Sequence, residues 1–156
     1  MISAWEKSVD LLSRAEHSSQ DLVRKLRSRG YDQEEIDETV ERLYSMGYLD
    51  DERYARSYIR KYHTSRSARQ IQSELLRKGI RLEQPEQVLT EVYEEEGGSE
   101  QDALTSMIRS RLRSCPEPGE KELRRLYAFL QRRGFSYADI RKTMEGFPEL
   151  QLIHIS

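Results

Sequence analysis

The sequence predicts an all-α protein, an elongated and curved array of three tandem three-helix repeats with about nine helices. Apolar residues recur at helical spacing almost throughout the chain, and no stretch of useful length alternates as a strand would. The segments LVRKLRSRGY, IQSELLRKGI and LYAFLQRRGF (22–31, 71–80 and 126–135) also repeat one pattern. Each has an aliphatic residue eight positions before a glycine, a leucine four before, a base just before and a large apolar residue just after.

The repeated segment is expected to be the middle helix of each unit. Its apolar stripe runs through positions −8 and −4, and its glycine can adopt the positive φ that closes a helix. The helices before it are expected at 4–15, 50–63 and 100–112, and those after it at 32–46, 82–95 and 136–147. We place the repeats at 1–48, 49–97 and 98–147, with a C-terminal tail at 148–156. Small units of this kind bury little alone and must stack, as in an α-solenoid.

Local signals support these helix limits. Helix caps are expected from the following side chains: Ser18 or Ser19, Asp32, Asp50, Ser67, Ser99 and Ser136. Pro85 is tolerated in a first turn and predicts a helix start rather than a kink. Linkers are expected at 96–99 (EGGS) and 115–119 (CPEPG), where glycine and proline break the helical pattern.

Composition restricts the class of protein. Hydrophobic residues make up 36% and charged residues 35%, which is typical of helices with one broad polar face. Cys115 is the single cysteine, so no intrachain disulfide or cysteine zinc cluster can form. The first residues lack a signal-peptide pattern, and no window is apolar enough to span a membrane. We therefore expect a cytoplasmic protein with no membrane partner.

The net charge of −2 conceals an uneven distribution. Residues 53–81 hold nine Lys or Arg against one acid, Glu74, whereas residues 82–102 hold eight acids and no base. Residues 1–52 carry thirteen acids against seven bases, and residues 103–133 carry eight bases against three acids. Such blocks are usually solvated helix faces, so position has to be weighed with charge.

The acidic triplet Asp50, Asp51 and Glu52 raises the alternative of an enzyme or metal protein. Adjacent carboxylates point about 100° apart on a helix, and no calcium-loop spacing follows. An N-cap and a first helical turn explain all three residues. No nucleotide, metalloprotease or serine-hydrolase motif is present, and His17, His63 and His154 are scattered. We expect no catalytic residue, metal or cofactor. We interpret Trp5 as a cap on the apolar end of the array, with a base-stacking platform and a partner contact as the alternatives.

The basic second repeat is the best candidate for a binding site. On the helix that starts at Asp51, Tyr54, Tyr58 and Tyr62 share one face with Ala55 and Ile59, and the arginines follow another. The next helix repeats this arrangement, with Ile71 and Leu75 inward. The predicted positive surface, which suits a polyanion or an acidic protein groove, consists of Arg53, Arg56, Arg60, Lys61, Arg66, Arg69, Arg77 and Lys78. The alternative is that these residues only keep a helical array soluble.

Residues 48–59 (YLDDERYARSYI) and 67–80 (SARQIQSELLRKGI) closely resemble the RecX family of bacterial regulators of the RecA recombinase. The resemblance extends more loosely over residues 4–147 and includes Arg132 to Phe135 with Ile140. It implies tandem three-helix repeats and binding to the RecA filament on DNA, with restraint of strand exchange, ATP hydrolysis and co-protease activity in DNA repair and the SOS response. It implies no catalysis.

One departure from the family pattern concerns the second repeat. Where the family commonly has a glycine and then an arginine before the isoleucine, this chain has Ser67 and Gln70, and Arg69 lies at a different helical angle. We expect a monomer that docks its basic face in the groove of a RecA filament, with the acidic repeats against basic patches of successive subunits. The alternative is a stand-alone DNA-binding protein that uses the same arginines on the phosphates of single- or double-stranded DNA.

Overall fold

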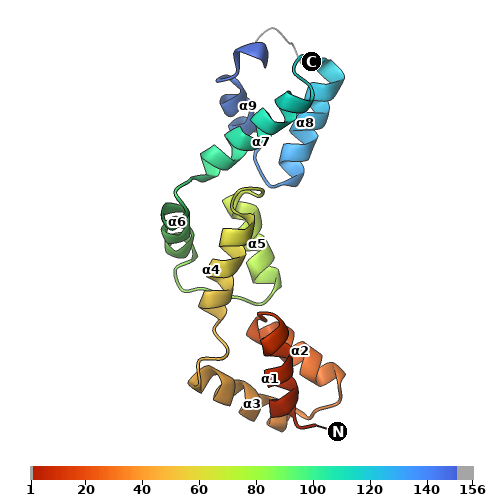
Figure 1. The fold of residues 1–156 in the computed structure, drawn as a ribbon, viewed down its shortest axis with the longest axis vertical. Coiled ribbons are helices and arrows are strands. Elements are labelled where there is room, and N and C mark those ends of the chain that lie inside the picture. Colours follow the sequence, from red (N-terminus) through yellow and green to blue (C-terminus); the bar gives the residue numbers. More distant parts are fainter. Residues whose placement is uncertain (1, 151–156) are drawn as a thin grey trace. The chain divides into compact units, whose positions relative to one another are not determined.

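The computed structural model describes residues 2–150, and the described part of the chain is all-α (Figure 1). It contains nine α-helices, a short 3₁₀ helix at Pro148–Leu150 and no strand. This confirms the predicted class and the three helices of each repeat. The helices are α1 (Ala4–Arg14), α2 (Ser19–Ser28), α3 (Gln33–Ser45), α4 (Asp51–Tyr62), α5 (Ala68–Arg77), α6 (Pro85–Glu96), α7 (Glu100–Ser114), α8 (Glu120–Arg132) and α9 (Tyr137–Met144).

The described residues form two compact units, and the second repeat contributes to both. One unit contains residues 2–58 and 73–85, and the other contains residues 59–72 and 86–150. The first therefore combines α1, α2 and α3 with the start of α4 and the end of α5. The second combines the end of α4 and the start of α5 with α6, α7, α8 and α9.

The first repeat has its own core. Leu22 and Leu26 of α2 are fully buried against Ile36 and Leu43 of α3, and Ala4 of α1 is fully buried beside them. These are the positions at which the apolar residues recur with helical spacing. The periodicity therefore predicted the buried faces of α2 and α3, whereas the buried residues of α1 are Ala4 and Ser8, which no apolar pattern indicated.

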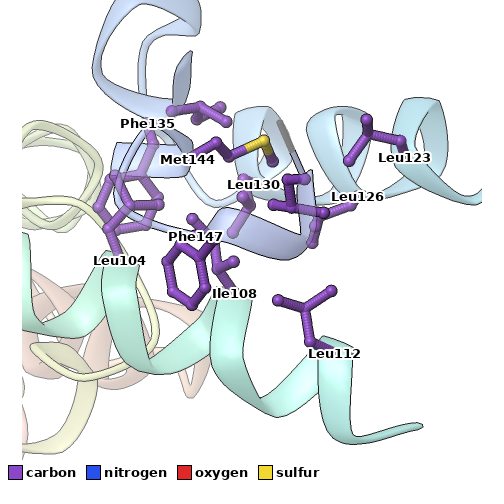
Figure 2. Close-up of a cluster of buried hydrophobic side chains, with 11 residues drawn as sticks. Leu104, Ile108, Leu112, Leu123, Leu126, Leu130, Phe135, Met144 and Phe147 are labelled. Atoms are coloured by element: carbon purple, nitrogen blue, oxygen red, sulfur yellow. The ribbon is translucent and has the colours of Figure 1, made fainter. Parts of the chain in front are cut away.

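The third repeat has a larger core, which Figure 2 shows. Leucine and isoleucine side chains of α7 face those of α8, and Phe135, Met144 and Phe147 close the cluster. The buried set is Leu104, Ile108, Leu112, Leu123, Leu126, Leu130, Phe135, Ile140, Met144, Phe147 and Leu150. Leu150 belongs to the predicted tail, so this part of the tail packs on the third-repeat core. Residues 151–156 of the tail lie outside the described residues.

Helix ends follow the predicted chemistry. The Oγ of Ser18 accepts a hydrogen bond from the backbone N–H of Asp21, which identifies Ser18 rather than Ser19 as the cap of α2. The other predicted caps accept in the same way from the N–H three residues later: Asp32, Asp50, Ser67, Ser99 and Ser136. The glycines that end the middle helices have φ values of 89° at Gly30, 80° at Gly79 and 95° at Gly134.

Within each compact unit, two consecutive repeats are connected by the same set of contacts, which we call the repeat joint. The Asp51 carboxylate accepts hydrogen bonds from the N–H (2.9 Å) and Oγ (2.8 Å) of Ser19, the first residue of α2. The Glu100 carboxylate accepts one from the N–H of Ala68 (3.1 Å), the first residue of α5. In both cases an acid at the start of one repeat caps the middle helix of the previous repeat, whose first N–H groups have no intrahelical partner.

The repeated glycine completes each joint. The Oγ of Ser18 donates to the carbonyl before Gly79 (3.3 Å), and the N–H of Ser67 donates to the carbonyl before Gly134 (2.9 Å). A Cβ on Gly79 would lie 2.8 Å from the Cβ of Gln20, and one on Gly134 would lie 2.6 Å from the Cβ of Gln70. The joint therefore requires glycine for close approach as well as for positive φ.

Gly30, in the first repeat, differs from the other two glycines in its surroundings. A Cβ placed on Gly30 would meet no atom within 4 Å. The positive φ alone explains why residue 30 is a glycine. Gly30 is therefore an internal control for the steric requirement at Gly79 and Gly134. None of the helices in residues 2–150 is both long and apolar enough to cross a bilayer.

Candidate polyanion-binding segment

The basic residues of α4 lie beside a layer of tyrosines. Ala55 and Ile59 of this helix are fully buried, whereas Tyr54 and Tyr58 are half-buried, with ring centroids 6.3 Å apart. The Tyr58 hydroxyl donates to the Glu74 carboxylate of α5 (2.8 Å), so Glu74 is used inside the protein. The only acid of residues 53–81 therefore does not interrupt the basic outer side of the segment.

Arg53 and Arg56 belong to the first half of α4. The Arg53 guanidinium is exposed and donates to the carbonyl of Gly47 (3.1 Å). Arg56 is half-buried, with its side chain 23% exposed, and pairs with Glu52 one turn earlier at 4.0 Å. Exposed pairs of this length contribute little to stability. Arg53 is thus the more accessible of the two cations.

Arg60 is engaged by the acidic end of α6. Its guanidinium lies 3.7 Å from a Glu95 oxygen and 3.6 Å from a Glu96 oxygen, and its side chain is 44% exposed. Two carboxylates therefore compete with any external anion for this arginine. Sequence reasoning treated the acidic block of residues 82–102 as a separate segment and missed this contact, because the pairing spans 35 residues and has no local pattern.

Lys61 and Arg66 both contact the ring of Tyr62. The Arg66 guanidinium lies 3.7 Å from the ring centroid and the Lys61 ammonium 5.3 Å from it, distances at which cations are attracted to aromatic faces. Lys61 is exposed, whereas Arg66 is half-buried. Arg66 thus differs from the outward placement expected from the helical angle, because stacking on Tyr62 covers part of it.

Arg69, Ser67 and Gln70 lie at the joint with the third repeat. The exposed Arg69 guanidinium donates to the carbonyl of Gly134 (3.1 Å), Ser67 caps α5, and Gln70 packs against Gly134. Ser67 and Gln70, which replace the usual glycine and arginine of the resembled family, therefore serve repeat packing in this chain. Arg69 bridges the joint and keeps an exposed side chain.

Arg77 and Lys78 extend the segment at the end of α5. Both are exposed; Arg77 donates to the Ser73 hydroxyl (3.3 Å), and the Lys78 ammonium lies 5.6 Å from the ring centroid of Tyr58. Arg81 is exposed as well and follows directly, although it was counted only in the charge balance and not among the candidates. The run of basic residues in 53–81 would have been sufficient to place Arg81 among the candidate residues.

The eight predicted residues are divided between the two compact units. Arg53, Arg56, Arg77 and Lys78 belong to one unit, and Arg60, Lys61, Arg66 and Arg69 belong to the other. Five of them are exposed, namely Arg53, Lys61, Arg69, Arg77 and Lys78, and Arg60 is exposed but paired with carboxylates. That all eight form one continuous surface stays a prediction.

The acidic triplet has the structural role expected of it. Asp50 accepts from the N–H of Arg53 (3.1 Å) as the N-cap of α4, and Asp51 and Glu52 lie in the first turn. The additional bond from Asp51 to Ser19 was not foreseen, although Glu100 occupies the equivalent position in the next repeat. Residues 2–150 contain no group of three His, Cys, Asp or Glu side chains that could hold a metal ion.

The histidines and the cysteine do not meet in one site within residues 2–150. His17 is buried and bonds the carbonyl of Ala15 (2.9 Å), and His63 bonds that of Arg60 (2.8 Å). Cys115 is half-buried in a cavity of about 200 Å³ near Leu112 and Leu126. His154 lies outside the described residues. The basic segment of residues 53–81 is thus the main chemical feature of residues 2–150.

Comparison with known proteins agrees with the repeat architecture. Family models for the first, second and third three-helix domains of RecX match residues 4–43, 50–89 and 99–144. The chain is 31% identical over 142 residues to the regulatory protein RecX of Vibrio vulnificus, covering 90% of each protein. It is 34% identical over 139 residues to that of Trichlorobacter lovleyi, covering 86% of this chain and 89% of the relative.

Solved structures show the same fold. The crystal structure of RecX from Lactobacillus salivarius matches with a TM-score of 0.69 at 18% identity, over 91% of this chain and 92% of the other. A second crystal structure, of a regulatory protein RecX, matches with a TM-score of 0.71 at 20% identity, over 91% of this chain and 71% of the other.

Proposed function

The chain belongs to the RecX family, and from this premise we propose that it is a non-catalytic cytoplasmic regulator that binds the RecA nucleoprotein filament and mainly inhibits its activities. The observation that carries the proposal is the basic segment of the second repeat, with nine Lys or Arg against one acid that is already used internally. A RecA filament on DNA contains both phosphates and protein surface. The basic segment of a regulator can bind the phosphates, and its acidic segments can bind basic residues of the recombinase.

Electrostatics supports a local anionic target rather than a long bare duplex. Phosphates attract the second repeat, because each neutralised phosphate releases counterions and makes binding salt-dependent. The first repeat has thirteen acids against seven bases and residues 82–102 have eight acids, so both would be repelled by DNA laid along them. These acidic segments suit basic patches on recombinase subunits instead.

Inhibition follows if the bound protein favours one filament state. A monomer that contacts two neighbouring recombinase subunits stabilises the arrangement in which both contacts are made, and it thereby slows steps that need another arrangement. ATP turnover, strand exchange and co-protease activity all require the filament to change state or accept another partner. One docking event can therefore restrain all three activities.

The experiment that tests the proposal is a RecA ATPase assay on single-stranded DNA with increasing amounts of the protein. We expect hydrolysis to fall saturably, and co-sedimentation with the filament to follow the same concentration dependence. Unchanged hydrolysis at saturating protein, together with no co-sedimentation, would contradict the proposal. The protein alone should hydrolyse no ATP.

Charge-reversal variants test which residues carry binding. We choose Lys61→Glu, Arg77→Glu and Lys78→Glu together, because these cations are exposed and none of them pairs with a carboxylate of residues 2–150. The matched control reverses three exposed bases of the third repeat, Lys121, Arg132 and Lys142, with the same change in net charge. We expect at least about tenfold weaker filament binding for the first variant and a much smaller loss for the control.

The stand-alone DNA-binding alternative predicts a different outcome. Bare single- or double-stranded DNA would then bind tightly at physiological salt, with a steep salt dependence and without RecA. We expect only weak binding of bare DNA, because Arg56 and Arg60 already pair with carboxylates of the protein and Arg66 stacks on Tyr62. Equal affinities for bare DNA and for the filament would favour the alternative.

A further inference from the structure

Exposed apolar side chains are concentrated in the first repeat. Seven large apolar residues of the described chain are at least 40% exposed: Ile2, Val9, Tyr44, Met46, Tyr48, Leu76 and Tyr137. Five of these seven lie in residues 2–48, although that part holds less than a third of the chain. Scattered exposed apolar residues are normal, but a concentration of them marks an interaction site.

Two of these exposed residues, Val9 and Tyr48, form one surface with Trp5 and Leu12, which are partly buried against the first-repeat core. Trp5, Val9 and Leu12 follow each other at i, i+4 and i+7 on α1, which places them on one face of the helix. The rings of Trp5 and Tyr48 have centroids 6.4 Å apart, and Leu12 and Tyr48 line a cavity of about 70 Å³. We call Trp5, Val9, Leu12 and Tyr48, with the neighbouring Met46, the first-repeat apolar surface.

This surface is held in place before any partner binds. α1 packs against α3 (Figure 1), and the Arg42 guanidinium of α3 lies 3.9 Å from the ring centroid of Trp5. The Tyr31 hydroxyl fixes the start of α1 by donating to the carbonyl of Ile2 (2.7 Å), and the N–H of Tyr48 donates to the carbonyl of Leu43 (2.9 Å). Pre-positioned Trp, Tyr and Arg side chains are the residues that dominate protein interfaces.

The surroundings of the surface are acidic. Exposed acids line the outer side of α3, namely Glu34, Asp37, Glu38 and Glu41, and Asp37 and Glu41 share a helical stripe with the exposed Tyr44. Glu16 and Asp50 line the 70 Å³ cavity beside Tyr48 together with His17 and Arg53, and Arg42 lies over Trp5, so acids outnumber bases around the surface but do not stand alone there. Phosphates are repelled by such a field, whereas lysines and arginines are attracted to it.

We propose that the first-repeat apolar surface docks a protein segment that carries apolar side chains together with Lys or Arg, such as one face of a basic amphipathic helix. The apolar side chains of that segment pack on Trp5, Val9 and Tyr48, and its cations face the acids of α3. This site is separate from the basic segment. Within the proposed function the segment belongs to the protein part of the filament, and only this last assignment rests on the proposed function.

The single tryptophan makes the site directly observable. Trp5 emission is measured while the protein is titrated with an 18-residue amphipathic helical peptide of leucine and lysine, and with its counterpart in which glutamate replaces lysine. We expect a saturable change of emission with the lysine peptide and none with the glutamate peptide. Equal responses to both peptides, or no response to the lysine peptide, would overturn the proposal.

A matched pair of variants tests the location by anisotropy of the labelled lysine peptide. Met46→Ser with Tyr48→Ser removes an aliphatic and an aromatic side chain from the surface, and Leu76→Ser with Tyr137→Ser removes an equivalent exposed pair elsewhere. We expect about tenfold or greater loss of affinity for the first variant and less than about twofold for the second. Equal losses would overturn the proposal.

Other occupants give different results. A single-stranded oligonucleotide that changes Trp5 emission at physiological salt, and no longer binds the Met46→Ser, Tyr48→Ser variant, would identify a base-stacking platform and overturn the proposal. Self-association that this variant abolishes would identify a second copy and overturn it as well. These titrations contain neither RecA nor a filament, so their failure is distinguishable from failure of the proposed function.

Discussion

The three repeated glycines allow the repeat joint to be measured by a single substitution made three times. Gly30, Gly79 and Gly134 all end a middle helix with φ between 80° and 95°. Only Gly79 and Gly134 are approached by the preceding repeat, whereas a Cβ on Gly30 would meet nothing within 4 Å. Alanine at each position therefore imposes the same backbone strain, and the steric cost differs.

The expected magnitudes follow from this geometry. Left-handed backbone costs an L-residue about 1–2 kcal/mol, and loss of glycine's unfolded-state freedom offsets about 0.4–1 kcal/mol of this. Gly30→Ala should thus destabilise by roughly 1 kcal/mol. At Gly79 and Gly134 the new Cβ lies 2.8 Å and 2.6 Å from a glutamine Cβ, which cannot move without its backbone. Overpacking of this kind adds about 1–3 kcal/mol.

Thermal unfolding followed by far-UV circular dichroism measures the series, and Trp5 fluorescence reports the unit that contains Gly79. For a chain of this size, 1 kcal/mol corresponds to roughly 2–4 °C in Tm. We expect a decrease of about 2–4 °C for Gly30→Ala and about 4–16 °C for the other two. Equal decreases at all three positions would refute the close approach of consecutive repeats, since backbone strain alone would then account for the glycines.

Three further predictions concern carboxylates and a buried tyrosine. Asp51→Asn and Glu100→Gln should each lower stability by about 1 kcal/mol, measured by urea unfolding, because each carboxylate caps the middle helix of the previous repeat. Burial and the nearby Glu100 carboxylate raise the pKa of Tyr93 to about 12, so folding stability should fall between pH 10 and pH 12, where only the unfolded chain is ionised at this residue. Tyr93→Phe should weaken that alkaline loss and cost little at neutral pH, because the buried hydroxyl has no hydrogen-bond partner among residues 2–150. A steep loss of stability at neutral pH would contradict this. Glu95→Gln with Glu96→Gln should change stability by less than about 1 kcal/mol yet strengthen filament binding by releasing Arg60, and weaker binding would show that the pair positions this arginine instead.

The local features of the fold were predictable because they depend on neighbouring residues. Ser18, Asp32 and Ser136 cap helices through bonds to the N–H three positions later, and Leu22 and Leu26 lie one helical turn apart. Contacts of this range are encoded in residue spacing. The sequence also located the basic segment. The residues after Asp50, Asp51 and Glu52 lack the ligand spacing of a calcium-binding loop, which excluded that role for the triplet.

Details of the candidate site were less predictable because they depend on contacts between distant residues. The angular positions of the arginines around their helices predicted side chains that point into solvent. In the structure, Arg66 instead stacks on Tyr62, and Arg60 pairs with two acids of α6. The exposure of Met46 and Tyr48 was not anticipated either, since an apolar pattern does not show which apolar face lacks a neighbour.

By itself the sequence determined the helices of residues 2–150, the caps of six of them, the repeated segment and the alternation of acidic and basic blocks, because each of these is written in the order and spacing of residues along the chain. Only the tertiary structure decided that Asp51 and Glu100 cap helices of the previous repeat and that Gly79 and Gly134 are closely approached while Gly30 is not. Those contacts join residues that are 32 or more positions apart, and packing of whole helices, rather than local spacing, brings such residues together.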